Sequence, residues 1–317
     1  MSRPVPPLPP PLRRGDRVQL VAASSALQDS TNLAAGLEIL RGWGLEVEDS
    51  APLLGRRWGY LAGRDSERAA DLARPAPDGS PAPLLACVRG GWGSARLLPE
   101  PADPAPPWLN QGPSPQWLLG FSDVTSLLWA RWARGWSGGV HGPLLTTLAN
   151  EPPWSQERLR ELLFGLALPP LEGDGWVGGV AAGPLLVANL TVATHLLGTP
   201  HLPDLRGAVV VFEDVGEAPY RLERMLTHWR LCGALQQLAG LGLGSFSGCK
   251  DSDREDQAPS TQFSAEEVLR ERTADLGLPV VANLPVGHAP GNGALPVGGW
   301  ARLDGDRGRL ELEVSWG

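Results

Sequence analysis

One serine in this chain has the surroundings of a catalytic nucleophile. Ser122 lies in Gly-Phe-Ser-Asp, directly after the apolar residues 117–119 and at the start of a helix-like segment. A serine at a strand-to-helix turn exposes its hydroxyl, and the N–H group that follows it can stabilise an oxyanion. The pattern departs from Gly-x-Ser-x-Gly, because Val124 stands at the place of the second glycine. The plainer alternative is that Ser122 or Asp123 caps the next helix.

A glutamate and a histidine could complete a catalytic triad with this serine. The apolar run 209–212 ends in Glu213, and carboxylates at the carboxyl end of a buried strand lie at the usual ligand-binding edge. His288 lies in the glycine- and proline-rich segment 284–298, where a histidine suits general-base work. In a triad the base activates the hydroxyl, and the acid orients the base. A solvated strand end and an incidental loop histidine are the alternatives.

The other four histidines compete with His288 for the role of base. His141 lies in His-Gly-Pro and could line the same cleft. His195 is expected in the core of an apolar helix, His201 at the surface, and His228 on the polar side of its helix. We therefore keep His288 as the candidate and His141 as its competitor.

A glycine-rich segment is the second candidate for contact with a ligand. Residues 88–99 read VRGGWGSARLLP, and glycines after a strand let backbone N–H groups approach a ligand closely. A tight strand-to-helix turn is the alternative. Arg89 is a candidate carboxylate clamp because guanidinium pairs bidentately with carboxylate, although it could instead brace this loop. Trp92, in the same segment, could line the cleft.

Composition and missing motifs exclude several classes of protein. The 317 residues carry 27 basic against 35 acidic side chains, a net charge of −8, which argues against nucleic-acid binding. No apolar run is long enough for a membrane span, and the start of the chain lacks the apolar region of a secretory signal. The three cysteines lie far apart, as expected for reduced thiols in a cytoplasmic protein. Dinucleotide, P-loop and zinc-protease motifs are absent, so we expect no cofactor and no metal.

The order of the predicted elements indicates an α/β fold. Strands and helices alternate through the first half of the chain, which favours a parallel sheet with function at the carboxyl ends of its strands. We predict a proline-rich arm at 1–16, an α/β domain at 17–150, a linker at 151–180 and a carboxy-terminal domain at 181–317. The tail is predicted to form a β-hairpin.

From about Arg13 to its end, the chain resembles the LD-carboxypeptidase family of serine peptidases. That family includes the muramoyl-tetrapeptide carboxypeptidases and the microcin C immunity peptidases. The matching segments follow the family's order, and they are RGDRVQLVAASS, GRDSERAADL, VRGGWGSARLLP, GFSDVTSLL, HGPLL, ANLTVATHLLGTP, VFEDVGEAPYRLERML and LPVGHAPGNGALPVG.

The resemblance implies roles for particular residues. The family's triad falls on Ser122, Glu213 and His288, and its oxyanion donors fall on the backbone N–H groups of Asp123 and Gly91. It also implies an α/β amino-terminal domain that carries the serine, a smaller β-rich carboxy-terminal domain that supplies the other two residues, and a homodimer.

The implied activity is a metal-free serine carboxypeptidase that cleaves an L-to-D peptide bond. The expected substrate is a murein tetrapeptide, which would lose its terminal D-alanine in cell-wall recycling in the cytoplasm. Two departures bear on substrate preference: Trp92 stands where tyrosine is common, and Val187 and Ala188 replace two glycines, which could narrow the cleft. One alternative is a hydrolase of peptidyl- or aminoacyl-nucleotide conjugates. A second is a ligand-binding protein without catalysis.

Overall fold

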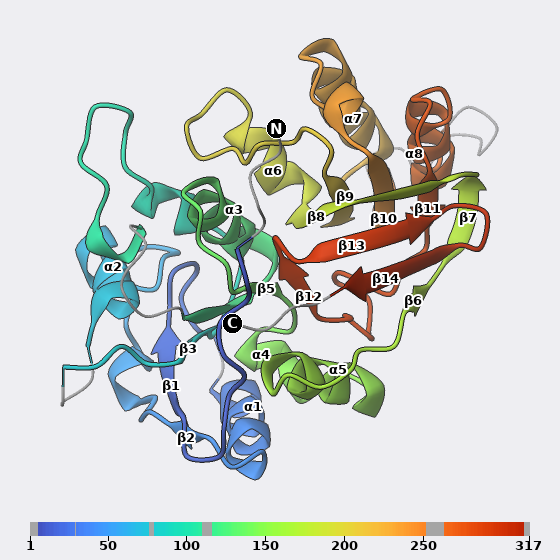
Figure 1. The fold of residues 1–317 in the computed structure, drawn as a ribbon. Helices are drawn as coiled ribbons and strands as arrows, with labels where there is room; N and C mark the ends of the chain where they lie inside the picture. Colours follow the sequence, from blue (N-terminus) through green and yellow to red (C-terminus); the bar gives the residue numbers. More distant parts are fainter. Residues whose placement is uncertain (1–5, 29, 76–78, 110–115, 252–262, 314–317) are drawn as a thin grey trace.

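The computed structural model describes residues 6–28, 30–75, 79–109, 116–251 and 263–313. Two β-sheets lie side by side, with helices packed around them (Figure 1). The predicted α/β fold class is confirmed. Within the described residues, no helix is long and apolar enough to cross a membrane.

The first sheet is parallel apart from one edge strand. Its six strands run in the order β12-β5-β4-β3-β1-β2. They are β1 (Arg17–Val21), β2 (Glu46–Val47), β3 (Leu84–Cys87), β4 (Trp117–Gly120), β5 (Gly139–His141) and the antiparallel β12 (Leu295–Val297). The helices of this half are α1 (Thr31–Gly42), α2 (Asp65–Ala73), α3 (Thr125–Ala133), α4 (Leu145–Leu148) and α5 (Pro153–Leu163). Strands β3 and β4 are apolar and buried, and β1 is buried from its second residue on, as expected of strands covered on both faces.

The second sheet is mixed and holds eight strands in the order β6-β14-β13-β8-β9-β10-β11-β7. They are β6 (Leu171–Glu172), β7 (Asp174–Val177), β8 (Val180–Asn189), β9 (Val209–Val215), β10 (Gly240–Ser247), β11 (Val280–Ala282), β13 (Trp300–Asp304) and β14 (Arg309–Glu313). Strands β8 to β11 are parallel neighbours, so their carboxyl ends share one edge. The helices are α6 (Leu190–Leu196), α7 (Pro219–Leu231) and α8 (Ala265–Thr273).

One hydrophobic core joins the two sheets. It contains Phe121 and Trp129 from the first half and Phe212 and Trp229 from the second. The indole N–H of Trp129 donates to the carbonyl oxygen of Val187 in β8, with 3.0 Å between the two atoms. Because interiors pack as densely as organic crystals, this shared core fixes the ends of β4 and β9 relative to each other.

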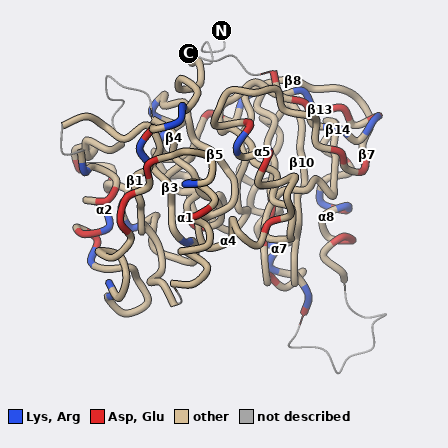
Figure 2. The backbone as a smooth tube through the Cα atoms, turned by 90° about the horizontal axis from the view of Figure 1, so that it is seen from below, with Lys and Arg blue, Asp and Glu red and all other residues tan. Residues whose placement is uncertain are grey.

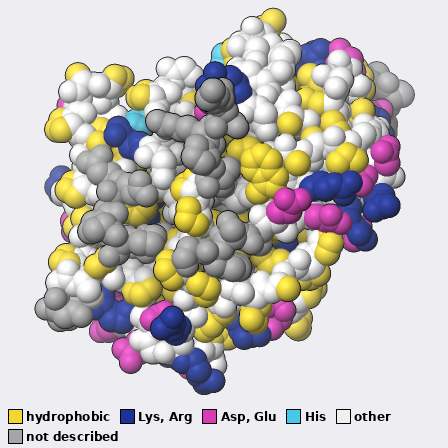
Figure 3. Space-filling model, viewed as in Figure 1, with side chains coloured by type: hydrophobic (Ala, Val, Ile, Leu, Met, Phe, Trp, Pro, Cys, Tyr) yellow, Lys and Arg dark blue, Asp and Glu magenta, His cyan; other side chains and the backbone are white. Residues whose placement is uncertain are grey.

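Charged side chains of both signs are interspersed over the outer elements. Figure 2 shows acidic and basic residues side by side on α2, α7 and α8. On the face in Figure 3 they gather over β13 and β14, where Arg309 pairs with Glu172 and Arg302 with Glu311.

The structure differs from the sequence-based prediction in two segments. The segment 151–180, predicted as a linker, contains α5 and contributes β6 and β7 to the second sheet, paired with β14 and β11. Strand β12 comes from the carboxy-terminal region but extends the first sheet. The hairpin predicted for the tail is confirmed by β13 and β14. Residues 1–5 of the predicted arm lie outside the described residues.

Two histidines have environments opposite to those predicted. His195, expected in the core, is exposed and lies with its ring centroid 6.2 Å from that of Trp92. His201, expected at the surface, is buried, and its Nε2 lies 2.9 Å from the carbonyl oxygen of Pro99. His201 is buried against Pro99, which is remote in the sequence, whereas His195 lies on the exposed side of α6 beside Trp92.

Candidate active site

Ser122 lies at a strained turn between β4 and α3. Its φ is +61°, a left-handed conformation that is rare for residues other than glycine. The turn is tight enough to require glycine at position 120, where an added Cβ would lie 2.8 Å from Cγ1 of Val124. Val124, the departure from the Gly-x-Ser-x-Gly pattern, therefore packs over Gly120. Strain of this kind is typical of a serine held out at the end of a strand.

The side chain of Asp123 fixes this turn in place. Asp123 is 1% exposed, and its Oδ2 accepts hydrogen bonds from Oγ of Ser24 at 2.6 Å and from the N–H of Ser94 at 2.8 Å. The hydroxyl of Ser94 donates in turn to the carbonyl oxygen of Asp123. In the first turn of a helix a backbone N–H has no partner within the helix, so the N–H of Asp123 is available to a ligand.

The glycine-rich loop closes over Ser122. A Cβ added at Gly90 would lie 3.3 Å from Oγ of Ser122, and one at Gly91 would lie 2.4 Å from Oγ of Ser25. Gly91 also has a φ of +105°, which favours glycine. The nitrogen of Gly91 is bonded to the carbonyl carbon of Gly90, so its N–H also belongs to the part of the loop that lies beside the serine. Within the described residues it donates to no acceptor.

His288 and Glu213 form a close pair at the carboxyl end of β9. Nδ1 of His288 lies 2.6 Å from Oε2 of Glu213, which is fully buried. Burial raises the pKa of the Glu213 carboxyl, and the hydrogen bond from His288 opposes that rise. Because a carboxylate only accepts, the pair places the proton on Nδ1 and leaves Nε2 as the free basic nitrogen.

Phe121 links this pair to the serine. The centroid of the His288 ring lies 4.7 Å from that of Phe121, the residue directly before Ser122. The ring of His141, the competing base, also contacts Phe121, with 5.6 Å between the two ring centroids. His141 is fully buried, and this burial lowers its pKa to about 3. The structure thus places His288 on Glu213 and against Phe121, the neighbour of Ser122, and gives His141 a second contact with the same Phe121 ring.

Arg89 and Asp214 have specific partners near this site. Nη1 of Arg89 donates to the carbonyl oxygen of Ala26 at 2.8 Å, so part of the guanidinium braces the loop. Asp214, next to Glu213, accepts from Nδ2 of Asn189 at 3.0 Å and from the hydroxyl of Thr191 at 2.8 Å. These bonds hold the start of α6 against the end of β9.

A cavity of about 560 Å³ lies beside this site, and sequence reasoning missed it. It is lined by Thr191, Thr194, His195, Glu217, Tyr220, Arg221, Arg224, Met225 and His228. Glu217 pairs with Arg221 at 3.5 Å, whereas Arg224 has no carboxylate partner in the described part of the chain. Arg221 and Arg224 therefore bring positive charge to the cavity, and Glu217 offsets part of it. The signal in the sequence was the spacing of arginine and histidine along one face of α7, opposite its buried stripe.

No group of three or more histidine, cysteine, aspartate or glutamate side chains within the described residues could hold a metal ion.

Comparison with known proteins identifies two matching family models. Residues 18–142 match the LD-carboxypeptidase N-terminal domain, and residues 182–303 match the LD-carboxypeptidase C-terminal domain. The first match contains Ser122, and the second contains Glu213 and His288.

Relatives named as carboxypeptidases match almost the whole chain. A Synechocystis sp. protein with a provisional carboxypeptidase name is 48% identical over 96% of each chain. The murein tetrapeptide carboxypeptidase of Pseudomonas aeruginosa is 35% identical over 92% of this chain and 94% of its own. The muramoyltetrapeptide carboxypeptidase structure from Oxalobacter formigenes has a TM-score of 0.78 at 27% identity, covering 93% and 97% of the two chains. A microcin C7 self-immunity protein shares the fold, with a TM-score of 0.82 at 20% identity over 98% and 99%.

Proposed function

Because this chain belongs to the LD-carboxypeptidase family, we propose that it is a serine carboxypeptidase that cleaves an L-to-D peptide bond. Its substrate is a murein tetrapeptide, from which it releases the terminal D-alanine. The relatives named for this activity support the substrate assignment. The single observation that carries the mechanism is the 2.6 Å contact between Nδ1 of His288 and the buried Glu213, beside a serine in a strained turn.

In this mechanism Ser122 attacks the carbonyl carbon of the scissile bond. Nε2 of His288 takes the hydroxyl proton and gives it to the nitrogen of the departing D-alanine, leaving an acyl-enzyme. A water molecule then attacks the ester, with His288 again as base, and the shortened peptide leaves. Glu213 keeps the imidazole in the required tautomer and stabilises the imidazolium.

Two backbone groups stabilise the oxyanion in the proposed mechanism. They are the N–H group of Asp123, in the first turn of a helix, and that of Gly91, which follows Gly90 in the loop beside Ser122. Such fixed donors stabilise negative charge that develops in the transition state. Arg89 holds the terminal carboxylate through guanidinium N–H groups that its bond to Ala26 leaves available.

The cavity between α6 and α7 favours an acidic peptide as substrate. A murein tetrapeptide carries carboxylates besides the terminal one, and Arg224, His195 and His228 border this cavity. Thr191 connects the cavity to the triad, because its hydroxyl donates to Asp214, the neighbour of Glu213. The proposal includes a cytoplasmic homodimer, which the family resemblance implies.

One feature favours a second candidate, the hydrolysis of aminoacyl-nucleotide conjugates. Trp92 is 40% exposed and lies against His195 at the cavity, where its ring could stack on a nucleobase.

The experiment compares three compounds by mass spectrometry of their products. They are L-Ala-γ-D-Glu-diaminopimelate-D-Ala, the same peptide with its terminal carboxylate amidated, and an aminoacyl-nucleotide conjugate. We expect release of D-alanine from the free acid and severely reduced cleavage of the amide. Equal rates on the acid and the amide would refute a carboxypeptidase, and cleavage of the conjugate alone would establish the second candidate.

A further inference from the structure

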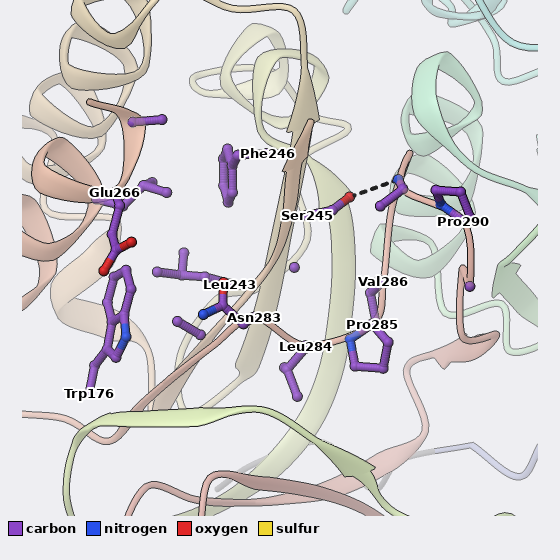
Figure 4. A pocket seen from close by; sticks show the side chains of 16 residues that line it. Trp176, Leu243, Ser245, Phe246, Glu266, Asn283, Leu284, Pro285, Val286 and Pro290 are labelled. Carbon is purple, nitrogen blue, oxygen red and sulfur yellow. Dashed lines mark hydrogen bonds between the residues drawn. The ribbon is translucent and has the colours of Figure 1, made fainter. Parts of the chain in front are cut away.

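The loop that carries His288 has a cavity on one side. Pro285, Val286 and residues 289–291 border a space of about 370 Å³ that also reaches Trp176, Leu243 and Phe246 (Figure 4). On this side Ser245 of β10 reaches toward the loop, and its hydroxyl accepts a hydrogen bond from the N–H of Ala289 at 3.2 Å. An open space contributes no packing contacts, so polar contacts help to hold the loop on this side.

A half-buried carboxylate contact holds the other side of the loop. Oε2 of Glu151 accepts hydrogen bonds from the N–H of Gly291 at 2.7 Å and from the N–H of Asn292 at 3.0 Å. Hydrogen bonds to an ionised acceptor are about twice as strong as neutral ones. Glu151 lies just before α5, in the segment between the two matched family models, and neither the triad nor the proposed oxyanion donors include it.

Asn292 connects Glu151 to Gly287, the residue before His288. Asn292 is fully buried, and its Oδ1 accepts from the N–H of Gly287 at 3.0 Å. Its carbonyl oxygen accepts from the hydroxyl of Ser155 in α5 at 2.8 Å. The backbone of Asn292 is therefore fixed at both its N–H and its C=O, while its side chain fixes Gly287.

Gly287 is the point at which this chain of contacts reaches the triad. Its φ is +116°, and a Cβ added there would lie 2.7 Å from both Cβ and Oε2 of Glu213. The backbone before His288 thus lies directly against the acid that pairs with it. A small shift of Gly287 would change the separation of Nδ1 of His288 from Oε2 of Glu213.

We propose that Glu151 is a positioning residue for the base: through Asn292 and Gly287 it holds His288 in the orientation that keeps Nδ1 on Glu213. It touches neither substrate nor reacting atoms. The inference rests on the proposed triad. It gives a residue of the segment 151–180 a part in positioning the catalytic base, whereas the sequence predicted only a linker there.

The kinetic test uses two substitutions of similar size. Glu151→Gln keeps an oxygen that can accept both N–H groups, and Glu151→Met removes it. We expect the methionine variant to lose about tenfold or more in kcat on the tetrapeptide with KM nearly unchanged, because small misplacements of a catalytic group are costly. The glutamine variant should stay within about threefold of the wild type. Glu157→Gln and Glu157→Met are the matched controls, since Glu157 lies exposed on α5 and pairs with Arg160.

A spectroscopic readout tests the same idea without turnover. The proton on Nδ1 of His288 should give a downfield NMR signal that disappears in His288→Ala. We expect Glu151→Met to broaden this signal through exchange with water and Glu151→Gln to keep it. An unchanged signal and unchanged kcat in Glu151→Met would overturn the proposal, and so would equal losses in the Glu157 variants.

The outcomes separate this proposal from the proposed function. If the wild-type protein releases no D-alanine, the proposed function fails, yet the His288 signal in the two Glu151 variants still decides whether Glu151 positions the ring. If Glu151→Met does not fold, as judged by circular dichroism, Ser155→Ala takes its place. This variant should lower kcat about threefold at constant KM, because it frees one end of Asn292, and an unchanged kcat would contradict the proposal.

Discussion

His141 is a buried imidazole without a polar partner, and its replacement by leucine should make the protein less sensitive to acid. Its side chain is fully buried, and neither ring nitrogen has a hydrogen-bond partner within the described residues. Burial lowers the pKa of His141 to about 3, and the charge of His288 acts in the same direction. The folded protein therefore keeps this ring neutral at every pH used for assays.

The magnitude follows from the two pKa values. In the unfolded chain a histidine has a pKa of about 6.5. Below that pH the unfolded state binds a proton that the folded state excludes, so the free energy of unfolding decreases as the pH falls from about 6.5 toward about 3. Between pH 7 and pH 5 the linkage relation gives a loss of about 2 kcal/mol from this residue alone.

The assay is urea unfolding of the wild type and of His141→Leu at pH 7, 6 and 5. Leucine has a similar volume and cannot bind a proton, so all other titrating groups are common to both proteins. The free energy of unfolding of the variant should gain about 2 kcal/mol relative to the wild type between pH 7 and pH 5. Parallel pH dependences would show that His141 does not stay neutral in the folded state.

The same variant separates the two candidate bases. A general base must be unprotonated to act, so kcat/KM should increase with pH as the base loses its proton. Since His141 is neutral throughout the assay range, this increase should persist in His141→Leu. It should vanish, together with most of the rate, in His288→Ala. The opposite result would make His141 the base.

Two further predictions concern the nucleophile and the substrate. Ser122→Ala should lower kcat by roughly 10³-fold or more without changing the circular dichroism spectrum, and a variant that keeps several per cent of the rate would exclude Ser122 as the nucleophile. The activity of the wild-type protein should survive EDTA. Arg224→Gln should raise KM for the acidic tetrapeptide about fivefold, corresponding to about 1 kcal/mol, with little change in kcat. Arg230→Gln, on the same helix but paired with Asp275, is its control, and an equal increase in KM there would remove the cavity from substrate binding.

The strands that carry the site could be predicted from the sequence because each begins as an apolar run and is followed by polar residues. Strand β4 is four buried residues followed by Phe-Ser-Asp, and β9 is an apolar run that ends in Glu-Asp. An apolar run of that length must be buried, and its polar end must then reach a sheet edge. The positions of Ser122 and Glu213 therefore follow from local pattern, whereas the role of each remains a prediction.

Contacts between distant segments could not be predicted in this way. Strands β6 and β7 have two and four residues, too short for a clear alternation, and they form by pairing with strands more than a hundred residues further along the chain. His201 is buried because the carbonyl oxygen of Pro99 lies against it. Glu151 has an ordinary sequence context, and its importance appears only once Gly291 and Asn292 lie beside it.

The site holds two unfavourable features that the fold must offset. A left-handed serine costs of order 1–3 kcal/mol, and a buried carboxylate costs more unless it is paired. Both lie where the sheets share one core, with Trp129 of α3 bonded to β8 and Phe212 of β9 packed on Trp229. Burial of these large aromatic groups makes the contact between the sheets favourable whether or not the triad is present. The strain at Ser122 and the buried carboxyl of Glu213 can therefore persist in the unliganded protein, and the proposed mechanism needs no rearrangement of these two residues before a peptide binds.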